Sequence, residues 1–450
     1  MPLRPVPAPH FPPLAPVHPH IAANQQRLFL QFVAQLRPHV GRDSSLPHRI
    51  KELMARHRAI GSRDRKLYRE LVYTWLRYHP WIDPLLDTDP ATAAKLTAWL
   101  APELKPTSAY RAAHCGDWPA VPPTLAEKST LLAQLLGGAG APRTLSESPA
   151  SNPTRPEAGS HLFDPQALLP SWFREHCPAA FTPPHLDALN TRANLWVRLQ
   201  CLDRNLVLDE FSAQGWPIES PAGLPDALCL PPNADVATSD AYRRGFVEIQ
   251  DLGSQLVLAH APQPPTGRWL DACAGAGGKT LQLARLLGAG GHVDATDIRL
   301  DILDELADRA KRARLDNITI VAQPTGQYDG ILVDAPCSGS GTWRRQPHLK
   351  WYVKPETIAA FAQTQRDILA ANAARVKPGG LLIYATCSLS HHENHDVTAA
   401  FLRAHPGFAA EPPPQSHGGV FDGLGTLLLP GTLNTDGFYV ALLRRSARQV

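Results

Sequence analysis

The chain has 450 residues, with 44 Lys and Arg against 41 Asp and Glu, so that its formal net charge is only +3. A chain of this length is too long to fold around a single hydrophobic core, so two or three domains are predicted. Its near-neutral charge excludes a nucleic-acid-binding protein that is cationic over its whole surface. No stretch of about 20 apolar residues and no basic-then-apolar leader occurs, which argues against a membrane span and a secretory signal.

Cysteine and proline usage narrow the class further. The seven cysteines are odd in number and show no C-x-x-C spacing. This pattern favours free thiols in a reducing cytoplasm over a disulfide framework or a zinc finger. The 45 prolines exceed the usual share of ~5% and predict stiff connecting segments. Because 44% of the residues are hydrophobic, packed cores are still expected.

The N-terminal region predicts a short tail and a helical domain. Residues 1–22 are rich in proline and are expected to form a disordered tail. Within residues 23–136, apolar side chains recur at three- and four-residue spacing, and Ser62 is a candidate helix cap. Between Asn24 and Tyr78, twelve Lys or Arg stand against four Asp or Glu, a local charge of +8. This charge favours contact with an RNA backbone, although a solvated helix face explains it nearly as well.

A linker and a small mixed module follow. Residues 137–160 are almost free of apolar side chains and predict a flexible linker. Residues 161–265 contain a helix-like start at Leu168–Phe173 and strand-like segments at Leu195–Leu199 and Phe246–Asp251. They predict a small α/β module ahead of the last domain.

Residues 266–450 alternate between strand and helix patterns. Apolar runs next to glycine or aspartate predict strands, and segments with helical spacing lie between them. Such alternation predicts an α/β domain with a mostly parallel, doubly wound, Rossmann-like sheet. The predicted strands are Trp269–Ala272, Val293–Asp297, Ile318–Val321, Tyr328–Asp334, Leu381–Ala385 and Phe438–Leu443, and the predicted helices are Thr280–Leu287, Ile302–Ala313 and Pro355–Val376.

The first of these strands runs into a glycine-rich loop, Asp271-Ala272-Cys273-Ala274-Gly275-Ala276-Gly277-Gly278-Lys279-Thr280. Glycines let the backbone approach a ligand, the next helix offers free N–H groups, and Asp297 suits ribose hydroxyls. A nucleoside cofactor is therefore predicted. Nicotinamide enzymes share this logic, but Asp271 before the loop is more typical of S-adenosylmethionine enzymes, and Gly275 to Lys279 is too short for a P-loop. The alternatives are a solvated helix start for Lys279 and a small buried hydrophobic role for Cys273.

Two further strands are each followed by a cysteine. Asp334-Ala335-Pro336-Cys337-Ser338-Gly339 follows one apolar run, and Thr386-Cys387-Ser388 follows another. Ligands of open α/β sheets bind at the carboxyl ends of strands, so Cys337 and Cys387 are expected at one crevice beside Asp334. A single cysteine there is usually a packing residue, whereas two in this arrangement indicate covalent catalysis.

Together, the segments Asp271–Thr280, Asp334–Gly339 and Thr386–Ser388 resemble the RsmB/Nop/Sun family of RNA cytosine-5 methyltransferases. The resemblance covers nearly the whole last domain and implies the class I S-adenosylmethionine-dependent fold. It extends to Phe246–Leu256, Glu393-Asn394 and Asp436-Gly437-Phe438. The N-terminal helical region, with Gly61–Arg65, is similar to the NusB-like RNA-binding domain of the bacterial small-subunit ribosomal RNA members.

The resemblance implies a covalent mechanism. Carbon 5 of cytosine becomes nucleophilic when a thiolate adds to carbon 6, a role that falls to Cys387. Cys337 would assist removal of the carbon-5 proton and release of the enzyme, and Asp334 would hydrogen-bond the ring near nitrogen 3. The residues implied for S-adenosylmethionine are Cys273, Ala274, Gly275, Ala276, Gly277, Gly278, Lys279, Asp297, Gln323 and Asp334.

Three positions depart from the family pattern. Ala276 stands where the family has proline, which loosens the cofactor loop but keeps its N–H donors. The segment Val321–Tyr328 lacks the aspartate that commonly reaches the adenine amino group, so Gln323 is the candidate replacement. Arg198-Leu199-Gln200 replaces arginine-x-asparagine, which leaves the RNA contacts of the small module open.

Basic and aromatic side chains after Cys337 predict an RNA contact. Arg344 and Arg345, together with Lys279, are the candidate RNA-binding residues. Trp351 offers a stacking surface, although it suits helix packing equally well. A target cytosine must leave its stack, which favours loops or locally opened RNA.

The histidines His391, His392 and His395 lack a nearby cysteine, and we expect them to cap and solvate a helix rather than to bind metal. The favoured prediction is a cytoplasmic, monomeric RNA methyltransferase without a metal or a membrane partner, acting on ribosomal RNA rather than transfer RNA. Two other classes remain open: a noncatalytic RNA-binding assembly factor and a nicotinamide oxidoreductase. The second leaves the paired cysteines unexplained.

Overall fold

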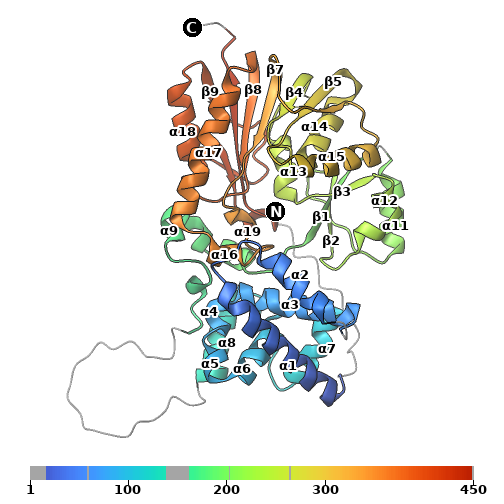
Figure 1. The fold of residues 1–450 in the computed structure, drawn as a ribbon, viewed down its shortest axis with the longest axis vertical. Helices are drawn as coiled ribbons and strands as arrows, with labels where there is room; N and C mark the ends of the chain where they lie inside the picture. Colours follow the sequence, from blue (N-terminus) through green and yellow to red (C-terminus); the bar gives the residue numbers. More distant parts are fainter. Residues whose placement is uncertain (1–16, 58–59, 138–161, 202, 263–264, 448–450) are drawn as a thin grey trace, which may run out of the picture. The chain divides into compact units, whose positions relative to one another are not determined.

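The computed structural model describes residues 17–57, 60–137, 162–201, 203–262 and 265–447. The chain divides into two compact units (Figure 1). The first, here called the helical unit, contains the described residues up to Ser171 and the short segment Pro347–Tyr352. The second, the sheet unit, contains Trp172–Gln346 and the residues from Val353 onward. Residues 1–16 of the predicted tail and 138–160 of the predicted linker lie outside the described residues.

The helical unit is built from short helices around one apolar core. Phe29 and Phe32 of α1 and Leu71 and Trp75 of α3 are fully buried, as the three- and four-residue spacing predicted. Its elements are α1 (Pro19–Leu36), a 3₁₀ turn (Arg37–His39), α2 (Leu46–Arg56), α3 (Ser62–Arg77), α4 (His79–Ile82), α5 (Leu85–Thr88), α6 (Pro90–Leu100), α7 (Lys105–His114), α8 (Leu125–Gly137), a 3₁₀ turn (Pro165–Leu168) and α16 (Leu349–Tyr352).

Two helix boundaries differ from the sequence prediction. Helix α1 begins at Pro19, so the last four residues of the expected tail are helical. Proline suits the first turn of a helix because the N–H it lacks would have no intrahelical partner there. Ser62 is the first residue of α3 rather than its cap, and the capping position is held by Gly61, without a side-chain hydrogen bond.

The sheet unit contains a three-stranded antiparallel sheet and a larger mixed sheet (Figure 1). The antiparallel sheet, ordered β2-β1-β3, has its own core around Val197, Phe211 and Leu228. Its strands are β1 (Leu195–Leu199), β2 (Ala227–Leu230) and β3 (Val247–Ile249). The helices of this part are α9 (Phe173–His176), α10 (His185–Leu189), α11 (Arg204–Ala213), α12 (Asp240–Arg243) and α13 (Leu252–Ala259), with 3₁₀ turns at Pro178–Phe181 and Val236–Thr238. The expected helix Leu168–Phe173 is absent, because Pro170 interrupts it.

The larger sheet is ordered β10-β11-β12-β8-β7-β4-β5-β6, and β9 pairs with β12. The central strands are parallel, and β12 joins β8 antiparallel. Its strands are β4 (Gly267–Asp271), β5 (Gly291–Ala295), β6 (Ile318–Ile320), β7 (Tyr328–Asp334), β8 (Val376–Thr386), β9 (Phe408–Glu411), β10 (Val420–Phe421), β11 (Thr426–Leu428) and β12 (Phe438–Arg445). The helices are α14 (Gly278–Leu287), α15 (Leu300–Ala313), α17 (Pro355–Ala373), α18 (His395–Ala404) and α19 (Pro430–Leu433), with 3₁₀ turns at Gly288–Gly290 and Ser340–Thr342.

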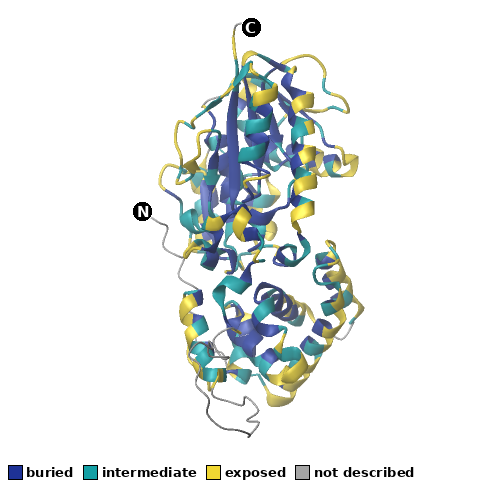
Figure 2. Cartoon of the chain, turned by 90° about the vertical axis from the view of Figure 1, so that its left-hand side faces the viewer, coloured by how far each residue is buried: buried dark blue, intermediate teal, exposed yellow. Residues whose placement is uncertain are grey.

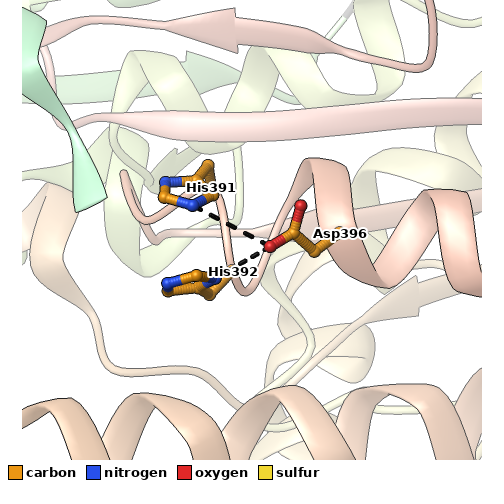
Figure 3. A group of neighbouring side chains, drawn as sticks. All are labelled: His391, His392 and Asp396. Atoms are coloured by element: carbon orange, nitrogen blue, oxygen red, sulfur yellow. Dashed lines mark hydrogen bonds and ion pairs between the residues drawn. The ribbon is translucent and has the colours of Figure 1, made fainter. Parts of the chain in front are cut away.

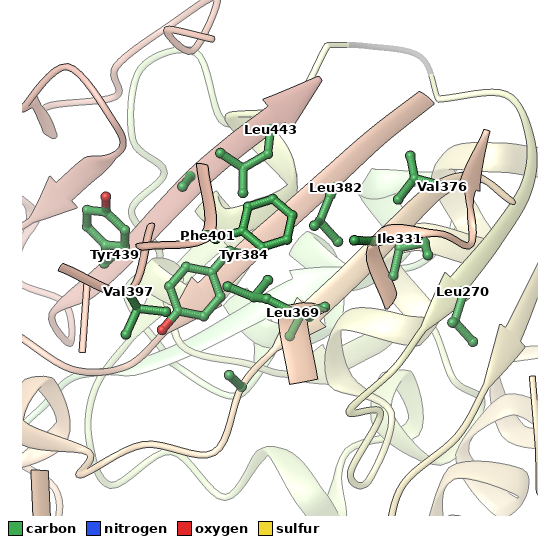
Figure 4. Packing of buried hydrophobic residues seen from close by; sticks show 14 of the residues in the cluster. Leu270, Ile331, Leu369, Val376, Leu382, Tyr384, Val397, Phe401, Tyr439 and Leu443 are labelled. Carbon is green, nitrogen blue, oxygen red and sulfur yellow. The ribbon is translucent and has the colours of Figure 1, made fainter. Parts of the chain in front are cut away.

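Both faces of the central strands β7 and β8 are largely buried, which explains why these strands read as continuous apolar runs (Figure 2). On β8, Leu382 and Tyr384 join the core under α17 and α18 (Figure 4). The alternate residues Leu381 and Ile383 join the opposite core, under α13 and α14. This period of two fixes the register of β8. The predicted Rossmann-like fold is therefore confirmed.

Helix α17 ends earlier than predicted. The helix ends at Ala373, and Val376, predicted as its last residue, begins β8. Pro378 and Gly379, whose φ is +78°, follow directly and cannot continue a helix without cost. Along the part of the chain that the structure describes, no helix is both long and apolar enough to cross a bilayer.

Candidate active site

A cavity of about 690 Å³ opens where the glycine-rich loop leaves β4. Strand β4 pairs with β5 on one side and with β7 on the other, so this loop lies at the switch point of the sheet, where ligands of such folds bind. Gly277 caps α14 with φ of +88°, and a Cβ there would lie 2.7 Å from Leu306 Cγ. Glycine is therefore required at Gly277 to bring the loop onto α15.

The cavity wall contains most of the residues predicted for the cofactor. Gly277 shapes the loop but does not line the cavity. Gln323 is exposed and is not among the residues that line the cavity. The assignment of Gln323 to the adenine is therefore not supported by the geometry. The predicted residues that line the cavity are Cys273, Ala274, Gly275, Ala276, Gly278, Lys279, Asp297 and Asp334.

Sequence reasoning missed part of the wall. Phe361, Thr364 and Ile368 of α17 line the cavity, as do Ile298 and Arg299. The three α17 residues are spaced by three and four positions, so they share one helix face. That spacing was visible in the sequence, but it did not reveal which cavity the face lines.

Carboxylates dominate the polar lining. Asp271 is buried and accepts hydrogen bonds from Thr280 Oγ1 at 2.7 Å and from the Cys273 N–H at 3.3 Å. Its burial, and to a lesser degree the nearby charge of Asp334, raise its pKa to about 7. Asp297 accepts the Gly275 N–H at 2.8 Å. Although burial alone would raise the pKa of Asp297, its hydrogen bonds from Arg299 and Gly275 outweigh burial and lower it.

Lys279 holds Asp334 in place. Its ammonium group donates to Asp334 Oδ2 at 2.8 Å and lies 5.1 Å from the centre of the Phe438 ring. Only 8% of the Lys279 side chain is exposed. The alternative of a solvated helix start is therefore wrong, and Lys279 has no open surface on which to bind an RNA phosphate.

The two cysteines of the strand-end motifs face each other. Strands β7 and β8 are parallel neighbours in which Asp334 pairs with Ala385, so the loops that follow them run side by side. Cys337 Sγ lies 3.3 Å from Cys387 Sγ, and Cys337 also lines the cavity. The hydrogen bond with Cys387 and, next, burial raise the pKa of the Cys337 thiol. The structure thus brings both predicted thiols to one place, as expected.

A buried carboxylate joins the two thiol loops. Glu393 Oε2 accepts hydrogen bonds from Ser338 Oγ at 2.5 Å and Ser388 Oγ at 2.6 Å, and Oε1 accepts the Ser338 N–H at 2.7 Å. Gln365 of α17 adds a bond to Oε1 at 3.1 Å. Because Ser338 follows Cys337 and Ser388 follows Cys387, Glu393 fixes the two cysteine backbones relative to each other. Burial raises the pKa of this carboxyl group.

A second backbone contact supports the same loops. The Gly341 N–H donates to the Cys387 carbonyl at 2.9 Å, and the Gly437 N–H donates to the Gly341 carbonyl at 2.9 Å. A Cβ on Gly341 would lie only 2.1 Å from the Gly437 carbonyl oxygen. The terminal Asp436-Gly437-Phe438 segment therefore packs directly on the cysteine loops.

The two arginines predicted to bind RNA are engaged by other residues of this chain. Arg344 is only 1% exposed and donates to the Thr435 carbonyl and to Asn434 Oδ1. Arg345 forms ion pairs with Asp251 and Asp436. Arg344 is therefore not accessible to an RNA backbone, whereas Arg345, whose side chain is 32% exposed, is already held by two carboxylates.

The two tryptophans near these arginines pack within the protein. Trp343 is buried against Phe173. Trp351 belongs to the helical unit, where its indole N–H donates to the Leu76 carbonyl at 2.7 Å. The helix-packing alternative for Trp351 is therefore correct.

The chain is similar to ribosomal RNA methyltransferases. Residues 257–444 match the family described as 16S rRNA methyltransferase RsmB/F. The chain is 36% identical over 298 residues to the probable ribosomal RNA small subunit methyltransferase B of Bacillus subtilis, covering 62% of this chain and 66% of that protein. It is 33% identical over 292 residues to ribosomal RNA small subunit methyltransferase B of Vibrio vulnificus, covering 62% and 67%. The chain thus spans about two thirds of the length of these relatives.

Solved structures share the fold. The crystal structure of PH0851 aligns with a TM-score of 0.67 and 22% identity, over 96% of this chain and all of that one. The structure of NSun6 from Pyrococcus horikoshii with SFG aligns with a TM-score of 0.52 and 19% identity, over 58% of this chain and 93% of that one. At these identities the comparison supports the architecture of the sheet unit.

Proposed function

Because the chain belongs to the RsmB/F methyltransferase family, we propose that it transfers a methyl group from S-adenosylmethionine to carbon 5 of a cytosine in ribosomal RNA. The observation that carries the proposal is the distance of 3.3 Å between Cys337 Sγ and Cys387 Sγ at the edge of the cofactor cavity. Packing alone does not require two free thiols, a fixed carboxylate and a nucleoside-sized cavity to meet at one strand edge.

The cavity suits a cationic, phosphate-free nucleoside. Both cations of its wall are already paired, Lys279 with Asp334 and Arg299 with Asp297, and the buried Asp271, whose pKa is about 7, adds partial negative charge. This lining therefore favours a sulfonium over a diphosphate. When bound, S-adenosylmethionine supplies the methyl group. Asp297 would hold the ribose hydroxyls, and the N–H groups of the loop from Cys273 would hold polar groups of the nucleoside.

The protein's own residues supply the covalent chemistry. The Cys387 thiolate adds to carbon 6 of cytosine, and the electron pair of the 5,6 double bond makes carbon 5 a nucleophile that takes up the methyl group. The Cys337 thiolate then takes up the carbon-5 proton, the electron pair of the C5–H bond restores the 5,6 double bond, and the electron pair of the bond between sulfur and carbon 6 returns to Cys387 as a thiolate. A raised pKa makes the Cys337 thiolate a strong base for this proton.

Asp334 would face the ring during the addition. Its Oδ2 is held by Lys279 at 2.8 Å, while the side chain remains 31% exposed toward the cavity. A carboxylate oriented in this way can accept a hydrogen bond from the amino group on carbon 4 of cytosine and so orient the ring; to offset the negative charge that develops at nitrogen 3, Asp334 would have to carry a proton and donate it there. Lys279 is thus proposed as the residue that positions Asp334.

Single-cysteine variants test the division of roles. Cys387→Ala should abolish tritium transfer from labelled S-adenosylmethionine to RNA while cofactor affinity stays within about twofold. Cys337→Ala should accumulate an enzyme–RNA adduct that survives denaturing electrophoresis, because release is blocked. Cys201→Ala, a free thiol outside the cavity lining, serves as the matched control. Appreciable turnover by Cys387→Ala would remove the nucleophile role from that residue.

The other candidate functions make different predictions. A noncatalytic assembly factor would bind RNA without tritium transfer, and transfer RNA as substrate would be labelled in place of ribosomal RNA. The NusB-like character of the helical unit, the cytoplasmic location and the monomeric state stay predictions. Bisulfite sequencing of RNA from cells with and without the protein would identify the modified cytosine.

A further inference from the structure

Three side chains of types that can bind metal lie close together after Cys387: His391 and His392 of the turn, and Asp396 in the first turn of α18 (Figure 3). Asp396 Oδ2 lies 3.9 Å from His391 Nε2 and 2.8 Å from His392 Nδ1. The three ligand atoms all lie within 4.8 Å of one another. Each side chain is about half exposed, so an ion in solution has access.

The tautomer of His391 leaves a lone pair directed at Asp396. His391 Nδ1 lies 3.0 Å from the carbonyl oxygen of His176, and a carbonyl can only accept, so Nδ1 carries the proton. In the neutral ring, Nε2 is therefore an acceptor. At 3.9 Å from a carboxylate oxygen it makes no hydrogen bond, and a cation between the two would be bound by both. A carbonyl on the far nitrogen is also the usual support of a metal-bound histidine.

The spacing fits a transition metal ion. Zinc binds histidine nitrogen and carboxylate oxygen at about 2.0–2.2 Å, which places tetrahedral ligand atoms roughly 3.4 Å apart. The observed separations of 2.8 and 3.9 Å lie on either side of that value. Two imidazoles disfavour calcium and magnesium, which prefer oxygen ligands.

We propose that His391 Nε2, His392 Nδ1 and Asp396 Oδ2 form a binding site for a divalent transition metal ion of the zinc class, with water completing the coordination. His392 Nδ1 donates to Asp396 Oδ2 at 2.8 Å, and when the ion binds at Nδ1 the neutral ring would carry its proton on Nε2 instead. This proposal replaces the expectation that these histidines cap and solvate a helix, and the experiment below decides between the two.

The site has a structural consequence and a matched control. Backbone bonds from the His391 N–H to the His176 carbonyl and from the Asp396 N–H to the His391 carbonyl hold the segment in place. A bound ion would add a cross-link between this turn and α18, a few residues after Cys387. His395 is the adjacent histidine, but its Nδ1 contacts Asp422 Oδ2 at 3.1 Å and it is not one of the three ligands.

The test uses the full chain without a histidine tag, in the Cys337→Ala, Cys387→Ala background so that the paired thiols of the cavity contribute no ligand. Chelator-treated protein is titrated with Zn²⁺ by calorimetry and with Co²⁺ by visible absorption. We expect one saturable site, a loss of affinity of at least tenfold in His391→Ala and in Asp396→Asn, and unchanged affinity in His395→Ala. Absence of saturation, or equal weakening by the His395 variant, would overturn the proposal.

Discussion

Replacing Glu393 by glutamine should move the thiols of Cys337 and Cys387 apart without creating a cavity in the core. The carboxylate accepts four hydrogen bonds, two on each oxygen. An amide keeps the shape but has one acceptor oxygen, so two donors lose their acceptor whichever way the group turns. Bonds to a charged group contribute about 1.5–3 kcal/mol each. Since the serine hydroxyls can reorient to accept from the new NH₂, roughly half of the combined loss should remain, about 1.5–3 kcal/mol.

The consequences are measurable in stability and in rate. A loss of this size should lower the melting temperature by about 3–12 °C, at roughly 2–4 °C per kcal/mol. A displacement of the thiol loops by about 1 Å should lower kcat by about 10²-fold, because catalysis depends on near-attack geometry. Methyl transfer to RNA gives kcat and KM. The rate at which diamide oxidises Cys337 and Cys387 to a disulfide, followed by mass spectrometry, reports their proximity.

Glu411→Gln is the matched control. Glu411 of β9 is half-buried and pairs with Arg444 at 2.9 Å, so its replacement removes one paired carboxylate from the same unit without touching a cysteine loop. It should leave kcat and the disulfide rate unchanged. The reasoning is refuted if Glu393→Gln keeps wild-type kcat, or if kcat falls while the two thiols still form a disulfide at the wild-type rate.

Two further substitutions test the supports of the site. Lys279→Met should lower the free energy of unfolding by about 2–4 kcal/mol and lower kcat, because it leaves the Asp334 carboxylate without its buried partner. The control, Lys377→Met, removes the exposed partner of Asp329 at the other end of β7. It should cost under ~1 kcal/mol when both variants are compared by denaturant titration. Equal losses in the two variants would contradict the role of Lys279. Gly341→Ala should destabilise the protein by about 1–3 kcal/mol and slow methyl transfer, because the new Cβ would lie 2.1 Å from the Gly437 carbonyl oxygen. The control, Gly407→Ala, has open space around the new Cβ and should melt within about 2 °C of the wild type. A wild-type melting curve for Gly341→Ala would show that the loop contact is not tight in solution.

Much of the sheet unit followed from local patterns. Strand β7 was predicted with its observed ends because a strand buried on both faces reads as an apolar run between polar residues. The loop from Asp271 to Thr280 and the two cysteine motifs were recognisable because each lies within ten consecutive residues. Their convergence at one edge also followed, since the carboxyl ends of neighbouring parallel strands always meet.

Contacts between residues far apart in the chain could not be predicted from the sequence. Arg345 was expected to bind RNA, but its partners Asp251 and Asp436 lie 94 and 91 residues away. Glu393 was noted only as part of a family motif, and its link to Ser338 spans 55 residues. The alternatives for Trp351 were likewise decided only by the packing of the helical unit.

The sequence by itself determined the order of strands and helices, the cofactor loop and the two nucleophile candidates, because backbone preference and hydrophobic periodicity act over a few neighbouring residues. Only the tertiary structure decided which charges are already neutralised and which remain available, and it alone brought His391, His392 and Asp396 around one point. A side chain's charge is written in the sequence, but its electrostatic environment depends on groups that the fold brings near it from elsewhere in the chain.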